Sequence, residues 1–392
     1  MKPYEELLLK LIRSSVLQSE EDFSEFSDFE DWGSLFTLCS IHSVVGMTYD
    51  KLVEQFGDRL PEKYAIWFKH SAFKEMSFQA VRSLSFMSFY QRLKEADLAP
   101  VILKGEVLRS LYPKPESRTS LDEDFLIDES KYEALTNELT NMGFEEVMQG
   151  DDDKHWFNKN YSVYFEVHTA PFPAEKSFEK WNMAFDGYQD KTIVNDNGII
   201  SLSREDNLVF LILHAAKHFI YSGVGIKQIV DIALFMREYG SEINMKRVRD
   251  TLKKVKAYTF ASEITAFIKK YIYPDTYTFG NARLGEDFVQ DIFKSGSLGK
   301  ADKDRIHSAN LTSSAFIGRS SLKKILFAPK DRLQQQYPFA KKHPILLPVA
   351  WFLRLVTNIP RSRKVLQTGG ERLRMIKKYG LIIKEDNPKE DK

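Results

Sequence analysis

The sequence predicts an α+β fold in which a small mixed β-sheet core is flanked by N-terminal and C-terminal helical regions. Three observations indicate this: helical spacing of apolar residues in the first hundred residues, strand-like alternation in the next hundred, and helical spacing again afterwards. A chain of 392 residues also exceeds the ~100 to 200 residues of one ordinary core. We therefore expect an N-terminal helical region, an α/β core, a helical domain and a basic helical C-terminal region, at residues 1–98, 99–195, 196–318 and 319–392.

The first helical region is indicated by apolar residues three and four positions apart. They are Leu7, Leu8, Leu11 and Ile12, then Leu35, Leu38 and Cys39, then Phe78, Val81, Leu84, Phe86 and Tyr90. We expect the aromatic residues of the last group, with Phe89, to form core rather than a platform on which bases stack. His42 is expected to pack or to cap a helix.

The middle region begins with a short apolar strand at 100–103, which turns at Lys104 and Gly105 into a helix that runs to about Tyr112. Later elements are a strand at 121–128, a helix opened by the capping box 130–133 and closed at Gly143, and a strand at 161–168 with a hairpin partner near 155–158. Ser203 opens a strongly apolar helix, and a further helix runs from Ile226 to Gly240.

Composition excludes several classes of protein. With 43% hydrophobic and 28% charged residues, the chain is neither disordered nor collagen-like nor a disulfide scaffold. The single cysteine, Cys39, cannot form an internal disulfide or a thiolate metal cluster and fits a reducing compartment. Charged residues interrupt the leucines of 1–15, so we expect no signal peptide, and no apolar run approaches the ~20 residues of a transmembrane segment. The expected location is cytoplasmic.

The net charge of +1 conceals a basic block at residues 319–378, which hold fifteen Lys and Arg against two acids. Such a block attracts nucleic acid, phosphate-rich partners or an anionic membrane, whereas a solvated helical face is the purely structural alternative. Within it, the apolar segment 346–356 with Trp351 lies between basic residues. This pattern fits either a membrane interface or an ordinary packed helix.

The most informative residues are acidic side chains on two of the expected strands. Asp122 and Asp124 are two residues apart, so they project from the same face of their strand. On the later strand, Glu166 shares a face with Tyr164 and His168. Carboxylates ~4 Å apart repel by about 4 kcal/mol at an effective dielectric of ~20, so three of them need a cation or must take up protons.

Oxygen ligands of this kind suit magnesium, or manganese in its place, with a substrate phosphate completing the coordination. Two such ions ~3.5 to 4 Å apart can activate an attacking hydroxyl and steady a departing pyrophosphate. A helix that starts after a glycine, as after Gly105, offers free amides to a triphosphate. In outline, the pattern indicates a phosphoryl-transfer site.

Five short motifs occur together in the chain: Leu103-Lys-Gly105, Arg118-x-x-x-Asp122-x-Asp124, Phe165-Glu-Val-His168, Asp31-Trp32 with His42, and His214-x-x-x-His218 followed by Asp231. In these motifs the chain resembles a known family, the uncharacterised bacterial nucleotidyltransferases of the DNA polymerase β-type superfamily. The motifs cover most of residues 30–240. The chain departs from the superfamily at Glu106, where a small residue is usual, and at Glu123, where an apolar residue is usual.

The resemblance implies roles for particular residues. Asp122, Asp124 and Glu166 would be the catalytic metal ligands, and Glu166 would also help to deprotonate the acceptor hydroxyl. The residues implied at the nucleotide are Lys104, Gly105 and Arg118. Separately from the resemblance, His168, His214 and His218 are candidates for the acceptor side. By spacing, His214 and His218 could instead bind zinc with Asp231 or His168 as third ligand, and a buried polar network is the structural alternative.

The leading hypothesis is an enzyme that moves a nucleoside monophosphate from a nucleoside triphosphate to a hydroxyl group on a small molecule, a protein or RNA. A second hypothesis is a catalytically inactive module that binds a nucleotide or a partner, and it is motivated by Glu106 and Glu123. A third is a nucleic-acid-binding protein that uses the basic block 319–378, whose affinity would fall steeply with salt.

Overall fold

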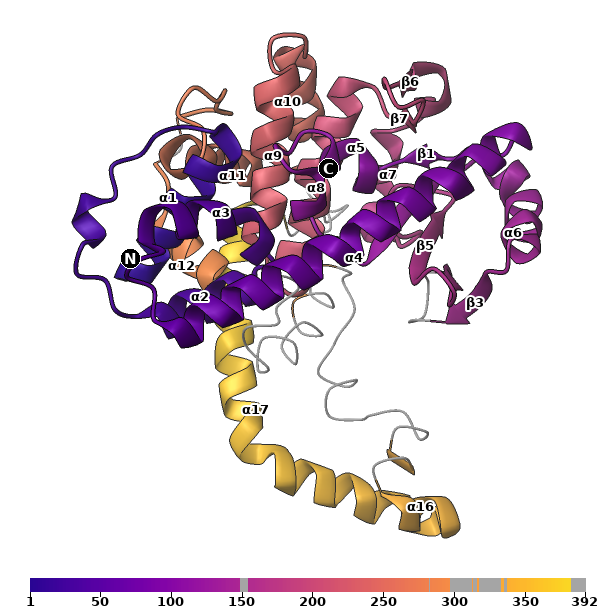
Figure 1. Cartoon of the computed structure of the whole chain (residues 1–392). Coiled ribbons are helices and arrows are strands. Elements are labelled where there is room, and N and C mark those ends of the chain that lie inside the picture. The colour runs from indigo at the N-terminus through magenta and orange to yellow at the C-terminus, as the bar shows by residue number, and fades with distance from the viewer. Residues whose placement is uncertain are drawn as a thin grey trace, which may run out of the picture.

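The computed structural model describes residues 1–148, 154–281, 283–296, 312, 316, 333–334 and 337–381. Within them, helices surround a mixed sheet (Figure 1), so the expected α+β class is confirmed. The described strands are β1 (Val101–Ile102), β2 (Asp122–Leu126), β3 (Glu145–Met148), β4 (Lys154–Asn158), β5 (Val163–His168), β6 (Ile193–Val194) and β7 (Ile200–Ser201). They lie in the order β3-β4-β5-β2-β1-β7-β6.

Strands β2 and β5 form the centre of the sheet. They run parallel, with Asp124 opposite Glu166, while β4 is the expected hairpin partner of β5 and β1 pairs antiparallel with β2. In β5, Phe165 and its alternate neighbours are buried, whereas Glu166 and His168 on the other face are partly exposed. This alternation, which the sequence predicts, gives the sheet one apolar face and one polar face.

The apolar face packs against the end of α4 (Glu62–Glu95) and against α6 (Tyr132–Asn141). Phe125 of β2 stacks on Phe165 of β5 at 4.4 Å between ring centroids, and Phe86 of α4 approaches both rings edge-on. The sheet is thereby held against the long helix that crosses the molecule in Figure 1.

The expectation that the four aromatic residues at the end of α4 are core is wrong for Phe78. Phe86, Phe89 and Tyr90 are buried, but Phe78, Val81 and Leu84 are 53%, 56% and 74% exposed. At about 100° per residue, Val81 and Leu84 lie on the opposite side of the helix from Phe86. The sheet covers only one side of α4, so an apolar pattern that surrounds the helix cannot be buried completely.

The other described helices build the rest of the body. They are α1 (Pro3–Leu17), α2 (Trp32–Ile41), α3 (Val45–Phe56), α5 (Gly105–Arg109), α7 (Glu179–Met183), α8 (Arg204–Tyr221), α9 (Ile226–Tyr239), α10 (Met245–Lys254), α11 (Tyr258–Tyr271) and α12 (Glu286–Ser295). One apolar cluster joins α1–α3 to α8–α12. The N-terminal helices and the helical domain therefore share a core, and the division into four regions stays a prediction.

Two capping expectations have different outcomes. Ser203 caps α8, because the Asp206 amide donates to its Oγ at 3.2 Å. The capping box at 130–133 is wrong: Asp128 accepts from the Ser130 amide and starts a short 3-10 helix, η3 (Glu129–Lys131), before α6 begins. Asp128 can take this role because its side chain lies one residue before the helical turn.

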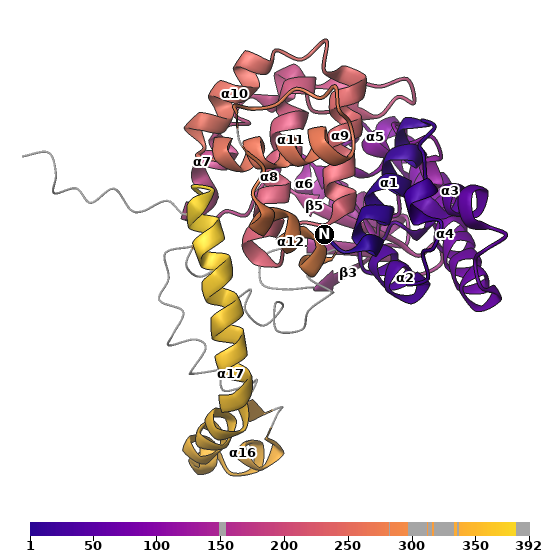
Figure 2. The same ribbon diagram turned by 90° about the vertical axis from the view of Figure 1, so that its left-hand side faces the viewer.

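The C-terminal arm, which we define as residues 338–378, leaves the body as a projection in both Figure 1 and Figure 2. It contains α16 (Pro338–Lys342), η7 (Pro344–Leu346) and α17 (Leu347–Lys378). The end of α17 returns to the body, where Arg372 Nη2 donates to the carbonyl of Phe219 at 3.0 Å and Tyr379, just beyond the arm, is buried. Of the basic block, residues 319–332 and 335–336 lie outside the described residues. None of the described helices combines the length and apolar content needed to cross a membrane.

Candidate functional site

Two carboxylates and an imidazole meet where β2 lies beside β5. One ligand atom from each of Asp124, Glu166 and His168 lies within 4.8 Å of the others. His168 Nε2 is 3.2 Å from Glu166 Oε1 and 3.7 Å from Asp124 Oδ1. The parallel register sets Asp124 opposite Glu166, and alternation brings His168 to the same face. The arrangement offers two oxygen donors and one nitrogen donor to a cation.

Asp122 shares this face but is not part of that group. It pairs with Tyr164, one alternate position earlier on β2 than Asp124. Because two residues span ~6.6 Å of a strand, its carboxylate starts well away from Glu166. Of the trio expected from the sequence, the structure brings two members together and adds His168, which was expected on the acceptor side. The catalytic role of Asp122 stays a prediction.

Lys104 supplies the positive charge of the site. Its Nζ lies 3.0 Å from Asp124 Oδ1 and 2.8 Å from His214 Nε2, and its side chain is 16% exposed. Burial alone would lower the pKa of Lys104, but the carboxylates of Asp124, Asp122 and Glu166 outweigh it and hold that pKa above its usual value. Burial would likewise raise the pKa of Asp124, and the Lys104 ammonium instead depresses it. Lys104 is therefore a firmly charged partner of Asp124.

His214 and His218 extend this contact away from the sheet. Their Nε2 atoms lie 3.1 Å apart on one face of α8, next to Lys104. Burial first, then the Lys104 charge, lowers the pKa of His214 well below its usual value and that of His218 to about 3. Both rings are therefore neutral at pH 7, so His214 can accept a hydrogen bond from the Lys104 ammonium.

The zinc alternative is not supported within the described residues. Asp231, one of its two candidate third ligands, uses both carboxylate oxygens on Arg118 and Tyr112. His214 and His218 belong to no group of three potential ligands in the described parts of the chain. Both histidines instead belong to a partly buried polar network with Lys104.

Arg118 is enclosed by the protein and is 3% exposed. Its Nε and Nη2 atoms donate to the two oxygens of Asp231 at 2.7 and 2.9 Å, and the Tyr112 hydroxyl donates to the same carboxylate at 2.7 Å. Asp231 raises the pKa of Arg118 against the opposing effect of burial. The guanidinium links the loop before β2 to α9. Its predicted contact with a triphosphate would compete with this ion pair.

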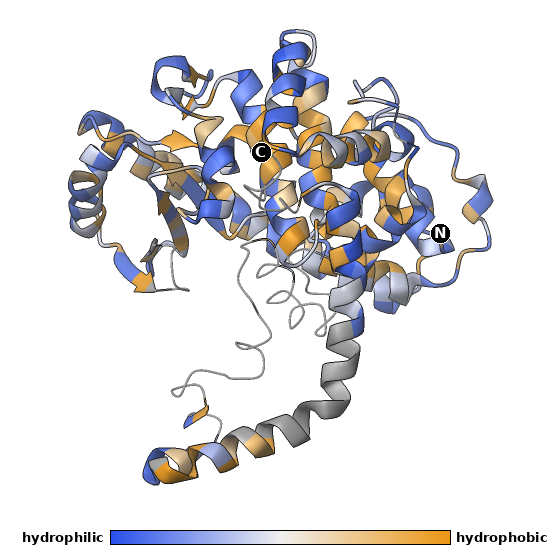
Figure 3. Cartoon of the chain, turned by 180° about the vertical axis from the view of Figure 1, so that it is seen from behind, coloured by the Kyte–Doolittle hydropathy of each residue, from blue (hydrophilic) through white to orange (hydrophobic). Residues whose placement is uncertain are grey.

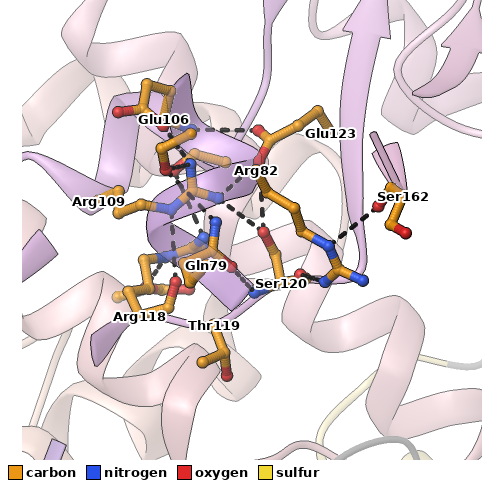
Figure 4. A network of polar contacts seen from close by, with 12 residues as sticks. Gln79, Arg82, Glu106, Arg109, Arg118, Thr119, Ser120, Glu123 and Ser162 are labelled. Atoms are coloured by element: carbon orange, nitrogen blue, oxygen red, sulfur yellow. Dashed lines mark hydrogen bonds and ion pairs between the residues drawn. The ribbon is translucent and has the colours of Figure 1, made fainter. Parts of the chain in front are cut away.

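Gly105 is required because the Glu123 carboxylate approaches it closely. The Glu123 carboxylate, on the apolar face of β2, accepts a hydrogen bond from the Glu106 amide at 3.2 Å (Figure 4). A Cβ on Gly105 would lie 1.5 Å from Glu123 Oε2, and Gly105 has a φ of +44°. The amide of Glu106, the second residue of α5, thus already has an anionic partner, and the place of Gly105 in nucleotide binding stays a prediction.

Both departures from the superfamily pattern, Glu106 and Glu123, contact the same cation. Arg109 has no exposed surface, and it donates through Nη2 to Glu123 at 2.6 Å and through Nη1 to Glu106. Arg109 Nη2 also donates to Ser120 Oγ at 2.7 Å, as Figure 4 shows. The two glutamates are therefore paired in a buried network on the apolar side of β2, away from the face that carries Asp124.

The sequence reasoning missed two basic residues of this region. The contact of Arg109 with Glu106 is weakly indicated by the sequence, since the two residues are three apart on a helix and such pairs interact. Lys227 lies on α9 and donates to the Thr119 carbonyl at 2.5 Å. Burial lowers the pKa of Lys227 to about 8, and Arg118 contributes. Nothing in the local sequence around Lys227 indicates this placement.

Comparison with known proteins gives one family. The model of a family described as "Uncharacterised nucleotidyltransferase" matches residues 28–272, which is more than half of the chain. No curated protein and no solved structure matches the chain. The matched range begins before α2 and ends after α11, so it includes the sheet and every residue of the site described above.

Proposed function

Because the chain belongs to this family of uncharacterised nucleotidyltransferases, we propose that it is a metal-dependent enzyme that moves a nucleoside monophosphate from a nucleoside triphosphate to a hydroxyl acceptor. The family supports nucleotidyl transfer in general. The metal, the roles of individual residues and the acceptor, which could be a small molecule, a protein or RNA, belong to our proposal.

The observation that carries the proposal is the meeting of Asp124 with Glu166 and His168 across two paired strands. The two acidic side chains are only 9% and 12% exposed. Two carboxylates this close and this little solvated repel each other, so the arrangement favours a bound cation. At present the Lys104 ammonium offsets part of that repulsion.

The donor set fits a divalent cation. Asp124 and Glu166 offer the oxygen donors that magnesium and manganese accept, and His168 offers a nitrogen donor that magnesium uses less readily. We therefore expect manganese to support activity at least as well as magnesium. When bound, the ion would neutralise triphosphate charge and lower the pKa of the attacking hydroxyl.

Residues of the chain would then bind the phosphate, accept the proton and position the site. Lys104 lies between Asp124 and His214, and its flexible stem lets the ammonium turn from Asp124 towards a phosphate oxygen. Glu166 would accept the proton of the acceptor hydroxyl, since its Oε1 lies on the polar face of the sheet beside His168. Arg118 would act as a positioning residue, because its charge is used by Asp231.

A labelled-nucleotide assay tests this. Purified protein is incubated with each α-labelled nucleoside triphosphate, with magnesium or manganese, and with RNA, protein or polyol acceptors. We expect Asp124→Ala and Glu166→Ala to lower label transfer by about 10²- to 10³-fold, as is typical when an electrostatic group of a site is removed. Glu146→Ala, an exposed acid on β3 of the same sheet, should transfer like the wild type. Equal transfer by Asp124→Ala and wild type would exclude this site.

A second candidate is a module that binds a nucleotide without turnover. It is favoured by two observations: Lys104 already neutralises Asp124, and Glu123 already accepts from the Glu106 amide near the start of α5. Calorimetry distinguishes the two candidates. Tight binding of a nucleotide without metal, in a protein that transfers no label, would support the module, whereas strict dependence of binding on the metal supports the enzyme.

A further inference from the structure

We propose that the outer end of the C-terminal arm binds the surface of an anionic lipid bilayer. This inference concerns a different part of the chain from the acidic site and does not depend on the proposed transfer reaction. It rests on an exposed apolar face, on a strong excess of positive charge and on the projection of the arm from the body.

The apolar face is formed where η7 passes into α17. Ile345, Val349 and Phe352 are 88%, 46% and 65% exposed, and Leu346 beside them is 37% exposed. Spacings of three and four residues place these side chains on one side of a helix. Figure 3 shows hydrophobic residues along this outer part of the arm. An exposed apolar face of this kind indicates a binding surface.

The positive charge of the same segment favours an anionic partner. Residues 337–381 contain ten Lys and Arg and one acid, Glu371, which gives +9. Lys341 and Lys342 come directly before the apolar face, and both are exposed. A helix with bulky apolar residues on one side and basic residues at its ends is typical of peptides that lie in a membrane interface. Anionic headgroups attract the cations while the acyl chains take up the apolar side chains.

Two other partners, a second copy of this chain and RNA, fit the outer end of the arm less well. Among the described residues, another large exposed apolar surface is the outer side of α4, with Ile66, Phe73 and Leu84. Residues 62–95 carry six Lys and Arg against three Glu, so like charges disfavour an arm of one copy docking on α4 of another. RNA would engage the cations but has no counterpart for an aliphatic face such as Ile345 and Val349. A bilayer satisfies both features.

The shape of the arm suits this contact. Figures 1 and 2 agree that α17 carries its outer end away from the body. A helix of 32 residues is ~48 Å long, so the apolar face can reach a surface while the body stays in water. No helix of the described chain can span a bilayer, so the arm would lie along the interface.

Co-sedimentation of the full chain with vesicles tests the proposal. We expect binding to phosphatidylcholine vesicles that contain phosphatidylserine, weak binding to pure phosphatidylcholine, and a loss of binding at high salt. Replacing two exposed apolar side chains together, Val349→Glu with Phe352→Glu, should weaken binding about tenfold or more. Lys341→Glu with Lys342→Glu should also weaken it.

The matched control is Val81→Glu with Leu84→Glu, two exposed apolar residues of α4, and it should bind vesicles like the wild type. Circular dichroism checks that all variants are folded. Equal vesicle binding by the Val349 and Phe352 double variant and the wild type would overturn the proposal. So would salt-dependent binding to RNA, lost on replacing Lys341 and Lys342, in a protein that ignores anionic vesicles.

Discussion

Lys227 shows how one partly buried cation can make stability depend on pH. Its pKa is lowered from 10.5 to about 8, mainly by burial. Below pH 8 the folded protein holds a charged, poorly solvated ammonium. Between pH 8 and 10.5 the folded state has released this proton while the unfolded chain keeps it. The contribution of Lys227 to the free energy of unfolding therefore rises across that window.

We expect Lys227→Met to stabilise the protein relative to wild type by about 1 to 3 kcal/mol at pH 7, and by progressively less as pH rises from 8 to 10.5. Urea unfolding at pH 7, 8.5 and 10 measures the difference. Lys246→Met, on the exposed side of α10, is the matched control. A constant difference for Lys227→Met would show that its ammonium is not destabilised by burial.

At the scale of elements, the turn from β1 into α5 is fitted to β2 through Gly105. An alanine there would meet the Glu123 carboxylate and would also strain a backbone with φ of +44°. We expect Gly105→Ala to cost about 3 kcal/mol of unfolding free energy, because it disturbs the buried contact of Glu123 with Arg109. In a Glu123→Ala background the same change should cost only about 1 kcal/mol, the backbone part.

A double-mutant cycle by urea unfolding measures these values. Gly187→Ala is the matched control, since Gly187 has φ of +67° and nothing within 4 Å of the added Cβ. It should cost about 1 kcal/mol in either background. If Gly105→Ala costs the same with and without the Glu123 side chain, the close approach does not explain the glycine.

At the scale of the whole molecule, Asp231 joins the α/β core to the helical body. Its carboxylate accepts hydrogen bonds from Arg118 and Tyr112, which lie 113 and 119 residues earlier in the chain. We expect Asp231→Ala to destabilise the protein by about 3 to 5 kcal/mol, because it leaves the Arg118 charge buried and unpaired. Arg118→Lys should also be less stable than the wild type, since an ammonium cannot bind both carboxylate oxygens of Asp231 as a guanidinium does.

Denaturant unfolding of Arg118→Ala, Asp231→Ala and the double variant checks this expectation. The double variant should lose clearly less than the sum of the single losses. Lys51→Ala, which breaks the exposed pair with Glu54, should cost below about 1 kcal/mol. Additive losses at Arg118 and Asp231 would show that the two side chains do not stabilise each other.

Much of the candidate site was predictable because its pattern is local. The alternation of Asp122 with Asp124 and of Glu166 with His168 appears in single strands, and the structure confirms both strands. The partners of Arg118 and Lys104 were not predictable. Asp231 and His214 lie on helices more than a hundred residues later, and no local pattern specifies which helix packs against the sheet. For the same reason the exposure of Phe78 on α4 was not predictable.

By itself, the sequence determined the α+β class, the strands that carry the acidic residues and the face from which each acid projects, because these depend on backbone periods of 2 and 3.6 residues. Tertiary structure alone decided which side chains meet. It placed Asp124 beside Glu166 and His168, left Asp122 outside that group, and set Lys104 between the sheet and α8. Strand register and helix packing depend on contacts between segments that are far apart in the sequence. Only those contacts bring the side chains of the separate motifs together in one site.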